Sequence, residues 1–236
     1  MLNLSKISKL SPYSEGWFNA RLGMMTSSKI SCICAPEGIG KGGMTYIRNK
    51  VAEVITGKPT EKNVTTEAIL WGIENEPKAL KYFQQVNNIP AIITDKHIVY
   101  DERYSSTPDG LVIMNEKFSM SDNQEFLNCE TLESKSYMTP SIHMMHVECE
   151  TPAAIKKIDP ELYWQVISQM YWADVLRGNA IFFHPDFPES SNYRLGHVVF
   201  KKIDLMADFK LFAARTAEAK QIFNDKINFS NKKQAA

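Results

Sequence analysis

The tripeptide Glu133-Ser134-Lys135 follows the turn sequence Thr107-Pro108-Asp109-Gly110, with 24 residues from Asp109 to Glu133. On an extended strand, residues two apart point to the same side, so Glu133 and Lys135 share one face. Pro-Asp-Gly is a turn signal and an apolar run at 111–114 follows it, so Asp109 stands at the start of another strand. The two segments together predict two carboxylates and one ammonium group that converge on one point.

These three side chains are typical of a site for a hard divalent cation and a water molecule, which is a common way to hydrolyse phosphodiesters. Asp109 would hold or bridge the first ion, and Glu133 would complete its ligands with the backbone carbonyl of Ser134. Lys135 would orient the attacking water or stabilise hydroxide. Taken singly, each residue has a simpler interpretation: Asp109 as a turn residue, and Glu133 and Lys135 as the solvent face of an edge strand.

Polar residues on two predicted helices are further candidates for this site. Glu76 is the candidate for a remaining carboxylate and metal ligand; Glu74 is an alternative, but residues two apart on a helix point in different directions. Gln165 and Gln169 lie four apart and so share one helical face, from which both could reach an active-site network. Each of these side chains could equally belong to an exposed polar face.

Length and composition favour a single domain. The chain has 236 residues, 44% of them hydrophobic, so we expect one domain over 1–236, with a core over about 14–226 and a flexible tail over 227–236. The 27 basic and 27 acidic residues give zero formal net charge, which argues against a uniformly basic DNA binder but allows charges that are separated in space. No stretch approaches the roughly 20 apolar residues of a membrane span, and no secretory pattern is present. We therefore expect a cytoplasmic protein without a membrane partner.

The four cysteines, at positions 32, 34, 129 and 149, do not form a recognisable metal motif. They include no Cys-x-x-Cys pair, and their spacing fits neither a zinc site nor an iron–sulfur cluster. We expect buried, reduced thiols.

Hydrophobic spacing is helical in the first part of the chain and changes to alternation after residue 88. Short helices are predicted after Ser14 and after Thr26, and 35–43 is expected to be a flexible loop. The remaining helices and strands are expected at these positions: helices 44–56, 66–83, 161–177 and 204–226; strands 91–94, 97–100, 110–114, 127–134, 179–184 and 195–202. A hairpin loop is expected over 115–126. This order predicts an α/β fold, with a mixed central sheet flanked by helices.

The candidate site residues belong to a longer series of motifs. In chain order these are Trp17 with Arg21-Leu22-Gly23-Met24-Met25-Thr26-Ser27-Ser28, Tyr46 with Glu53 and Thr56-Gly57, Leu70-Trp71-Gly72 with Glu76, Thr107-Pro108-Asp109-Gly110-Leu111, Leu132-Glu133-Ser134-Lys135, and Tyr163-x-Gln165-Val166-x-x-Gln169. The Glu-x-Lys pair is weak by itself, but the ordered set spans about residues 14–200 and is specific. The series resembles the YqaJ-type viral recombinases, the family that includes phage lambda exonuclease.

This resemblance implies a restriction-endonuclease-like core of the PD-(D/E)xK type. It also implies a Mg²⁺-dependent exonuclease that digests one strand of duplex DNA from 5′ to 3′, yielding mononucleotides and a 3′ single-stranded tail for phage-type recombination. One or two Mg²⁺ ions are expected, with Mn²⁺ as a substitute. The implied partners are double-stranded DNA ends, further copies of the chain in a ring-shaped homotrimer, and a single-strand annealing protein.

Residue by residue, the resemblance gives catalytic roles to Asp109, Glu133 and Lys135. Glu76 matches the family's helical glutamate and Gln165 its active-site glutamine. The remaining matches concern the 5′-terminal phosphate: Arg21 and Ser28 match positions that bind it, Thr107 replaces a serine before Pro-Asp, and Lys41 loosely replaces a second arginine. Arginine offers a planar fork for a terminal phosphate, and Ser28 is expected near a helix N-terminus that favours anions.

Besides Thr107 and Lys41, the sequence departs from the lambda enzyme in two further places near the site. The segment between Asp109 and Glu133 is longer, so we expect an extended hairpin there. Ser136-Tyr137 stands where the lambda enzyme has Cys-Pro. These departures affect the expected ring geometry and 5′-phosphate dependence more than the expected nuclease chemistry.

Two other functions remain compatible with these residues. The same core could belong to an endonuclease that cuts at particular structures or sites. The chain could also be a DNA-binding recombination module without catalysis. The intact Asp109, Glu133 and Lys135 argue against the second alternative, because a purely binding site has no use for acidic groups that face phosphate.

Overall fold

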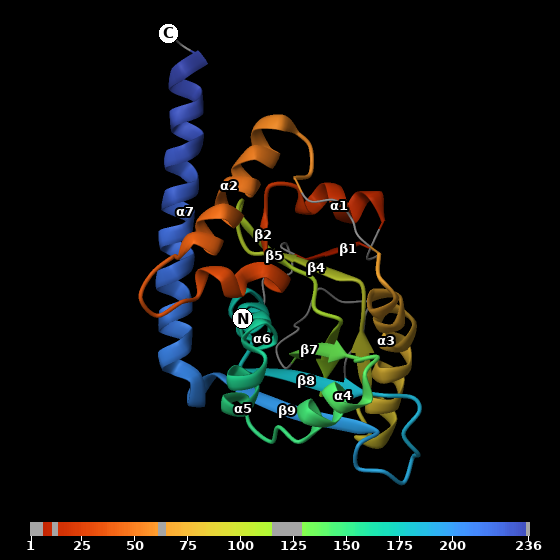
Figure 1. Cartoon of the computed structure of the whole chain (residues 1–236). Coiled ribbons are helices and arrows are strands. Elements are labelled where there is room, and N and C mark those ends of the chain that lie inside the picture. The colour runs from red at the N-terminus through yellow and green to blue at the C-terminus, as the bar shows by residue number, and fades with distance from the viewer. Residues whose placement is uncertain (1–6, 11–13, 61–64, 115–128, 235–236) are drawn as a thin grey trace.

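The computed structural model of the protein describes residues 7–10, 14–60, 65–114 and 129–234. It contains two β-sheets and seven α-helices within these residues (Figure 1). The hairpin predicted over 115–126 lies outside the described residues. No helix in the described ranges is both long enough and apolar enough to span a bilayer.

The larger sheet has five strands in the order β3-β6-β7-β8-β9. Their bounds are β3 Ala91–Ile93, β6 Gly110–Ile113, β7 Cys129–Lys135, β8 Arg177–Phe183 and β9 Leu195–Lys201. Only β7 and β8 are parallel; the other neighbouring pairs are antiparallel. The predicted mixed sheet is therefore confirmed. Gly110 pairs with Leu132, and this register sets Asp109, just before β6, opposite the end of β7 that carries Glu133.

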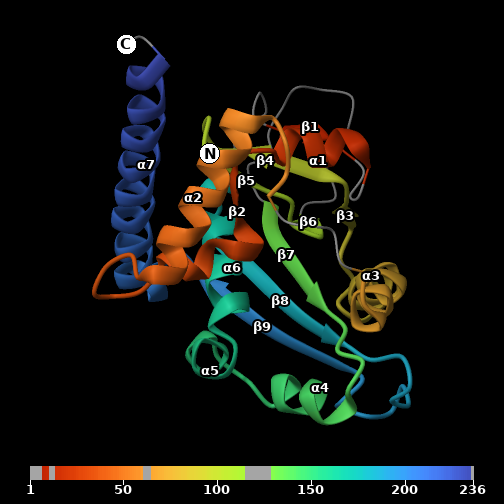
Figure 2. The ribbon, with the colours of Figure 1, turned by 45° about the horizontal axis from the view of Figure 1, so that its top comes forward.

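Helices cover both faces of this sheet, as Figure 2 shows. Helix α6 (Pro160–Ala173) packs on β7 and β8 from one side, and α3 (Glu67–Val86) packs on them from the other. Side chains alternate accordingly: Leu132 of β7 packs with Ala79 and Phe83 of α3, whereas Leu111 of β6 belongs to the core on the α6 side. β6 and most of β8 are buried on both faces and are largely apolar, whereas β7 carries buried polar side chains and β9 alternates between buried and more exposed residues.

A smaller sheet of four short strands lies above the first, in the order β1-β4-β5-β2 (Figure 1). Its strands are β1 Ile7–Lys9, β2 Met25–Thr26, β4 Lys96–Val99 and β5 Tyr104–Ser106. The prediction from sequence found only β4. The other three strands have two or three residues each, which is too short for a period of two to be recognised.

The remaining elements connect and cover the sheets. They are α1 Glu15–Arg21, the 3₁₀ helices η2 Ser27–Ile33 and η3 Lys202–Leu205, α2 Lys41–Thr56, α4 Pro140–Val147, α5 Pro152–Ile158 and α7 Met206–Gln234. Ser14 caps α1 by accepting a hydrogen bond from the Trp17 backbone N–H, as predicted. Helices α4 and α5 were not predicted from sequence, because each is short and begins with a proline, a residue that also marks turns.

Three predicted boundaries were wrong. The loop expected over 35–43 is shorter, because α2 already begins at Lys41. The helix expected over 161–177 ends at Ala173, since Asp174 adopts a left-handed conformation with φ of 51°. The strand expected over 179–184 begins earlier, at Arg177, so Gly178 lies in β8, where a Cβ atom would be 2.7 Å from the Met170 side chain of α6. The missing side chain thus permits the close packing of α6 on β8.

The C-terminal helix is longer than the sequence suggested. We expected a flexible tail over 227–236, but α7 continues to Gln234 and projects beyond the rest of the molecule in Figure 1. Buried residues such as Phe212 and Phe223 anchor it as far as residue 223. Nearer its end, Phe229 is 65% exposed.

The cysteines are free thiols, as expected. Cys34, Cys129 and Cys149 are buried and Cys32 is partly exposed. Burial raises the pKa of the Cys129 thiol to about 11, so the thiol stays protonated and unreactive at neutral pH.

Candidate active site

A cavity of about 510 Å³ opens where β6 and β7 meet α3, α1 and the segment that leads into α4. Its polar lining includes eight of the residues singled out in the sequence: Arg21, Ser28, Glu76, Thr107, Asp109, Glu133, Lys135 and Gln165. The backbone brings them from five separate segments of the chain to one place.

Glu133 is the most constrained side chain in the cavity, with 3% of it exposed. Its Oε1 accepts hydrogen bonds from the Lys135 ammonium group at 2.7 Å and from the Gln165 amide at 2.6 Å. Its Oε2 accepts a hydrogen bond from the Gln169 amide at 2.6 Å. Gln165 and Gln169, one turn apart on α6, thus fix both oxygens of this carboxylate from the same helical face.

Asp109 is held against the end of β7 by the backbone. Its Oδ2 accepts a hydrogen bond of 2.7 Å from the backbone N–H of Ser134. This bond aligns the Asp109 carboxylate beside Glu133. It uses only Oδ2 of Asp109 and does not involve Oδ1. The carbonyl group of Ser134 belongs to the same short stretch of β7.

The carboxylates perturb one another's proton affinity. Burial, and then the charges of Glu133 and Glu76, raise the pKa of Asp109 well above its usual range. Burial, and then the charge of Glu133, raise the pKa of Glu76 to about 7. Burial alone would lower the pKa of Lys135, but Glu133 and Asp109 raise it above its ordinary value, so its side chain stays cationic. The three carboxyl groups therefore oppose one another's ionisation, and Lys135 offsets only part of this repulsion.

The donor set is suited to a hard cation. Carboxylate and carbonyl oxygens are the ligands that Mg²⁺ prefers, and a bound cation would relieve the repulsion that raises the pKa values of Asp109 and Glu76. Across the described ranges, no three Asp, Glu, His or Cys side chains are placed together as a ready-made metal cluster. The available oxygens are thus those of Asp109 and Glu133, the Ser134 carbonyl, and Glu76 from across the cavity.

The alternatives for the helical carboxylate are separated by the structure. Glu76 lines the cavity, whereas Glu74 points away and pairs with Lys78 at 2.7 Å on the exposed side of α3. Pro77 lies inside α3, which continues past it to Val86. Position 76 is thus the position on this helix that faces Glu133.

Of the four residues proposed for the terminal phosphate, three line the cavity and one does not. Arg21 lies with its guanidinium carbon 4.0 Å from the centre of the Trp17 ring. Trp17 in turn donates a hydrogen bond of 3.2 Å from Nε1 to the hydroxyl of Thr107. Ser28 lies in the first turn of η2, and its hydroxyl is 3.4 Å from that of Thr26. Lys41 is exposed at the start of α2 and is not part of the cavity lining.

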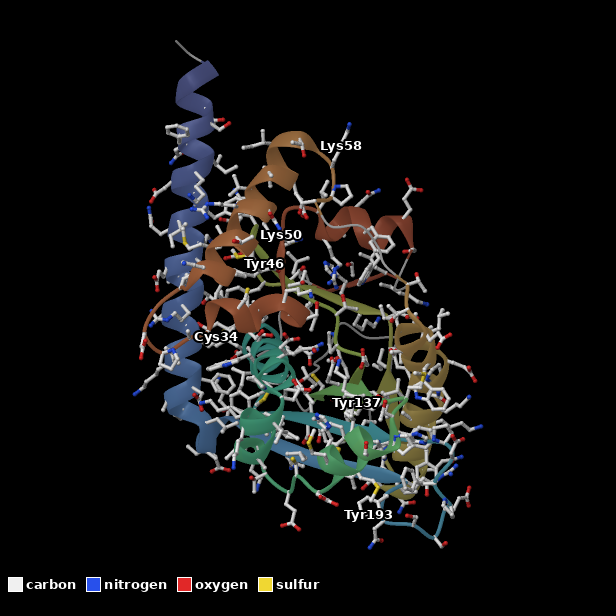
Figure 3. All side chains as sticks on the ribbon, viewed as in Figure 1. Cys34, Tyr46, Lys50, Lys58, Tyr137 and Tyr193 are labelled. Atoms are coloured by element: carbon white, nitrogen blue, oxygen red, sulfur yellow. The ribbon has the colours of Figure 1, made fainter. Side chains whose placement is uncertain are left out.

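The Arg21 segment is fastened to α2 by a buried carboxylate. Glu53 accepts hydrogen bonds from the backbone N–H of Gly23 at 2.9 Å and from the ammonium group of Lys50 at 3.0 Å. Gly23 has φ of 73°, which favours glycine, and so brings its N–H to this contact. Tyr46, labelled with Lys50 in Figure 3, accepts a further hydrogen bond from the backbone of Thr26. Helix α2 therefore positions the loop between Arg21 and Ser28.

We predict that Glu53→Gln lowers the free energy of unfolding by about 3 kcal/mol, because it removes a buried charge paired with Lys50. Urea unfolding at neutral pH measures this difference. The matched control is Glu74→Gln, whose exposed pair with Lys78 should contribute at most about 0.5 kcal/mol. Equal stability losses in the two variants would contradict the role given to Glu53.

The pH dependence of this effect follows from the pKa of Glu53. Although burial opposes ionisation, hydrogen bonds from Gly23 and Lys50 lower that pKa below its usual value. Stability from such a group is present above its unfolded-state pKa and is lost as the pH falls through the folded-state pKa. The difference between wild type and Glu53→Gln should therefore shrink in acid.

Several side chains behind and beside the cavity were not predicted from the sequence. His97 of β4 is buried behind Thr107, with Nδ1 3.1 Å from the Thr107 hydroxyl. Tyr137, which lies beside α4 in Figure 3, lines the cavity and donates a hydrogen bond of 3.0 Å to Asp159, the N-cap of α6. His146 stacks on Tyr137, with ring centres 4.2 Å apart. Nothing in the local sequence distinguishes these residues from ordinary core residues.

The sequence matches the YqaJ-like viral recombinase domain over residues 16–175. The chain belongs to this family. The match covers more than half of the chain and contains all the residues proposed for the site, so the resemblance seen in the ordered motifs is confirmed. Membership of the YqaJ-like family also confirms the prediction that the protein is an enzyme of the nuclease class.

Solved structures confirm the restriction-endonuclease-like fold. The alkaline exonuclease LHK-Exo from Laribacter hongkongensis aligns with a TM-score of 0.69 and 19% identity, over 94% of this chain and 98% of that one. Its complex with dAMP gives a TM-score of 0.70. A phage-related exonuclease from Haemophilus somnus 129PT aligns with a TM-score of 0.60 and 13% identity, over 88% and 96% of the two chains. Comparison with curated protein sequences gives no match.

Proposed function

We propose that this YqaJ-like protein is a Mg²⁺-dependent exonuclease that degrades one strand of duplex DNA from its 5′ end and leaves a 3′ single-stranded tail. The observation that carries the proposal is the cluster of Asp109, Glu133 and Lys135 at the ends of β6 and β7, within one open cavity. Two solved relatives of the same fold are described as exonucleases, which agrees with this assignment. The product tail would serve phage-type recombination.

The cation would be held by the carboxylates of Asp109 and Glu133, the carbonyl of Ser134 and the carboxylate of Glu76. Mg²⁺ fits these oxygen donors, and Mn²⁺ would substitute. When bound, one or two such ions polarise the scissile phosphate and lower the pKa of the attacking water. The raised pKa values of Asp109 and Glu76 support this proposal, because they mark a site with excess negative charge.

The side chains around the carboxylates have separate tasks. Lys135 stabilises negative charge on the attacking oxygen and, through its bond to Glu133, stays close to the reacting phosphate. Gln165 and Gln169 hold the Glu133 carboxylate in one orientation, so little reorganisation is needed during the reaction. Asp109 is held in register by the Ser134 backbone.

Selection of a 5′ end is assigned to Arg21, Ser28 and Thr107, on the wall of the same cavity. A terminal phosphate is a better acceptor for the Arg21 guanidinium than a terminal hydroxyl, because it offers charged oxygens to the guanidinium fork. Lys41 would contact DNA outside the cavity. The neutral net charge of the chain makes such local cations the main source of attraction for DNA.

The assembly and partners are part of the same proposal. We propose a homotrimeric ring around the DNA and cooperation with a single-strand annealing protein in the cytoplasm of the host cell. Light scattering of the purified protein tests the ring directly, since a mass of three chains is expected and a monomeric mass would exclude it.

The decisive experiment uses linear duplexes labelled at either end, with Mg²⁺ or with EDTA. Loss of the 5′-ended strand to mononucleotides in Mg²⁺ alone supports the proposal. A covalently closed circular duplex should stay intact; its cleavage would identify an endonuclease instead. Binding of DNA without any cleavage in Mg²⁺ or Mn²⁺ would identify a non-catalytic module.

We predict that Arg21→Ala slows digestion of 5′-phosphorylated ends roughly tenfold or more, because it removes a charged donor to the phosphate. Digestion of unphosphorylated ends should change little. Arg48→Ala, which removes an exposed arginine of α2 outside the cavity lining, controls for the lost positive charge. If the wild-type enzyme digests both kinds of end at the same rate, Arg21 does not have this role.

A further inference from the structure

A buried histidine lies directly behind the wall of the cavity. His97 of β4 is 1% exposed, and its Nδ1 is 3.1 Å from the Oγ1 of Thr107. The Trp17 indole donates to the same oxygen at 3.2 Å, and Arg21 lies over the Trp17 ring. Thr107, Trp17 and Arg21 line the cavity, whereas His97 does not. One hydroxyl group therefore connects a hidden imidazole to the proposed phosphate site.

The number of protons on His97 decides which atom donates in its hydrogen bond to Thr107. Burial, and then the charge of Arg21, lower the pKa of His97 to about 4, so its ring is neutral at physiological pH and carries a single N–H. Its Nε2 is buried and has no hydrogen-bond partner within the described part of the chain. A proton on Nε2 would be a buried donor without an acceptor, which is rarer than an acceptor left unused. The proton therefore belongs on Nδ1, which donates it to Thr107.

Thr107 Oγ1 then accepts two hydrogen bonds, because an indole N–H can only donate. Both of its lone pairs are used, and no described residue accepts its own hydroxyl proton. A hydroxyl group in this state can act only as a donor toward the cavity. A phosphate monoester, whose exposed oxygens are all acceptors, fits such a donor better than water or a ribose hydroxyl does.

We propose that His97 is a positioning residue for the 5′-terminal phosphate: it saturates the acceptor side of Thr107 and so turns the Thr107 hydroxyl proton toward a phosphate oxygen beside Arg21. The inference rests on the proposed function for the choice of ligand. The inference adds His97 of β4 to the residues of the phosphate site. His97 does not touch DNA, but it determines the direction in which the Thr107 hydroxyl donates its hydrogen bond to the phosphate. A neutral imidazole is suited to this task, because it orients the hydroxyl without adding a charge beside Arg21.

Two substitutions separate hydrogen bonding from packing at this position. In His97→Asn, the amide nitrogen takes approximately the place of Nδ1 and can still donate to Thr107. In His97→Leu, a side chain of similar bulk fills the space without any donor. Thr107→Val removes the hydroxyl but keeps its shape, and it provides the comparison if His97→Leu folds poorly.

The readout is binding of short DNA duplexes with a 5′-phosphate or a 5′-hydroxyl, measured by fluorescence anisotropy in EDTA so that no cleavage occurs. We expect the wild type and His97→Asn to prefer the phosphorylated duplex. His97→Leu should lose about tenfold of that preference, with unchanged binding of the hydroxyl duplex, and Thr107→Val should lose the preference to a similar extent. The double variant should lose no more than either single variant, because both act through one hydrogen bond.

The contrary results distinguish failure of this inference from failure of the proposed function. Full phosphate preference in His97→Leu would show that the histidine does not act through Thr107. Equal losses in His97→Asn and His97→Leu, on both kinds of duplex, would show a purely structural role. No preference in a wild-type protein that still digests DNA would remove the inference but leave the exonuclease intact. A clear preference in a protein that never cleaves DNA would instead remove the proposed function.

Discussion

Asp109→Asn should reduce turnover of linear duplex DNA by about 10³-fold while leaving the folded protein as stable as the wild type or more stable. The amide keeps an oxygen for the Ser134 backbone N–H, so the local geometry is retained. The charge that would hold the cation is lost, and with it the repulsion from Glu133 and Glu76. Cleavage of labelled duplex and thermal unfolding in EDTA measure the two effects separately.

The stability gain should depend on pH in a defined direction. Because the pKa of Asp109 is raised in the folded protein, the wild type loses stability as the pH rises through that value. The asparagine variant has no such group, so its advantage should grow with pH and vanish toward about pH 4. Mg²⁺ should raise the Tm of the wild type and have less effect on the variant. An active variant, or one that Mg²⁺ stabilises as much as the wild type, would contradict the site.

The parts of the fold that could be predicted from sequence are those with long, regular hydrophobic patterns. The central strands and helices α2, α3 and α6 have enough residues for a period to emerge, and Ser14 and Gly57 mark helix ends by their own chemistry. Short elements such as β2 and α5 depend on their neighbours for stability. Their sequences hold no more than a turn signal, so tertiary contacts decide their structure.

The site could be predicted only as a set of candidates. The spacing of Asp109, Glu133 and Lys135 predicts their roles. The sequence nevertheless left Glu74 and Glu76 as alternatives on one helix. The pairing of Glu74 with Lys78 and the approach of Glu76 to Glu133 depend on how α3 is rotated against β7. That rotation is set by Ala79, Leu80 and Phe83 packing on the sheet, which no local pattern near residue 76 reveals.

His97 illustrates a second limit. A single histidine in an apolar strand has the same local sequence whether it packs in the core or orients an active-site hydroxyl. The role proposed for His97 depends on the pairing of β4 with β5, because this pairing places Thr107, the residue after β5, beside the His97 ring. Residues that act through a neighbour in space therefore need the structure, whereas residues that act on the substrate recur in motifs.

Lys135→Met should also reduce turnover, by about 10²- to 10³-fold. Unlike Asp109→Asn, it should lower the stability of the folded protein. The ammonium group is the cation that contacts Glu133, and the methionine side chain fills most of its space without a charge. Glu133 and Asp109 would then face each other without a neighbouring cation, so the free energy of unfolding in EDTA should fall. Binding of duplex DNA should persist, because Arg21 and the cavity wall are unchanged.

The matched control is Lys78→Met, which removes the same group from an exposed pair with Glu74 and should change stability by no more than about 0.5 kcal/mol. Mg²⁺ should restore much of the stability that Lys135→Met loses, since a bound cation supplies the missing positive charge. Asp109→Asn and Lys135→Met thus shift the charge of one cavity in opposite directions. If both variants lose activity but respond alike to EDTA and Mg²⁺, the residues do not share a cation site, and the loss of activity must have another cause.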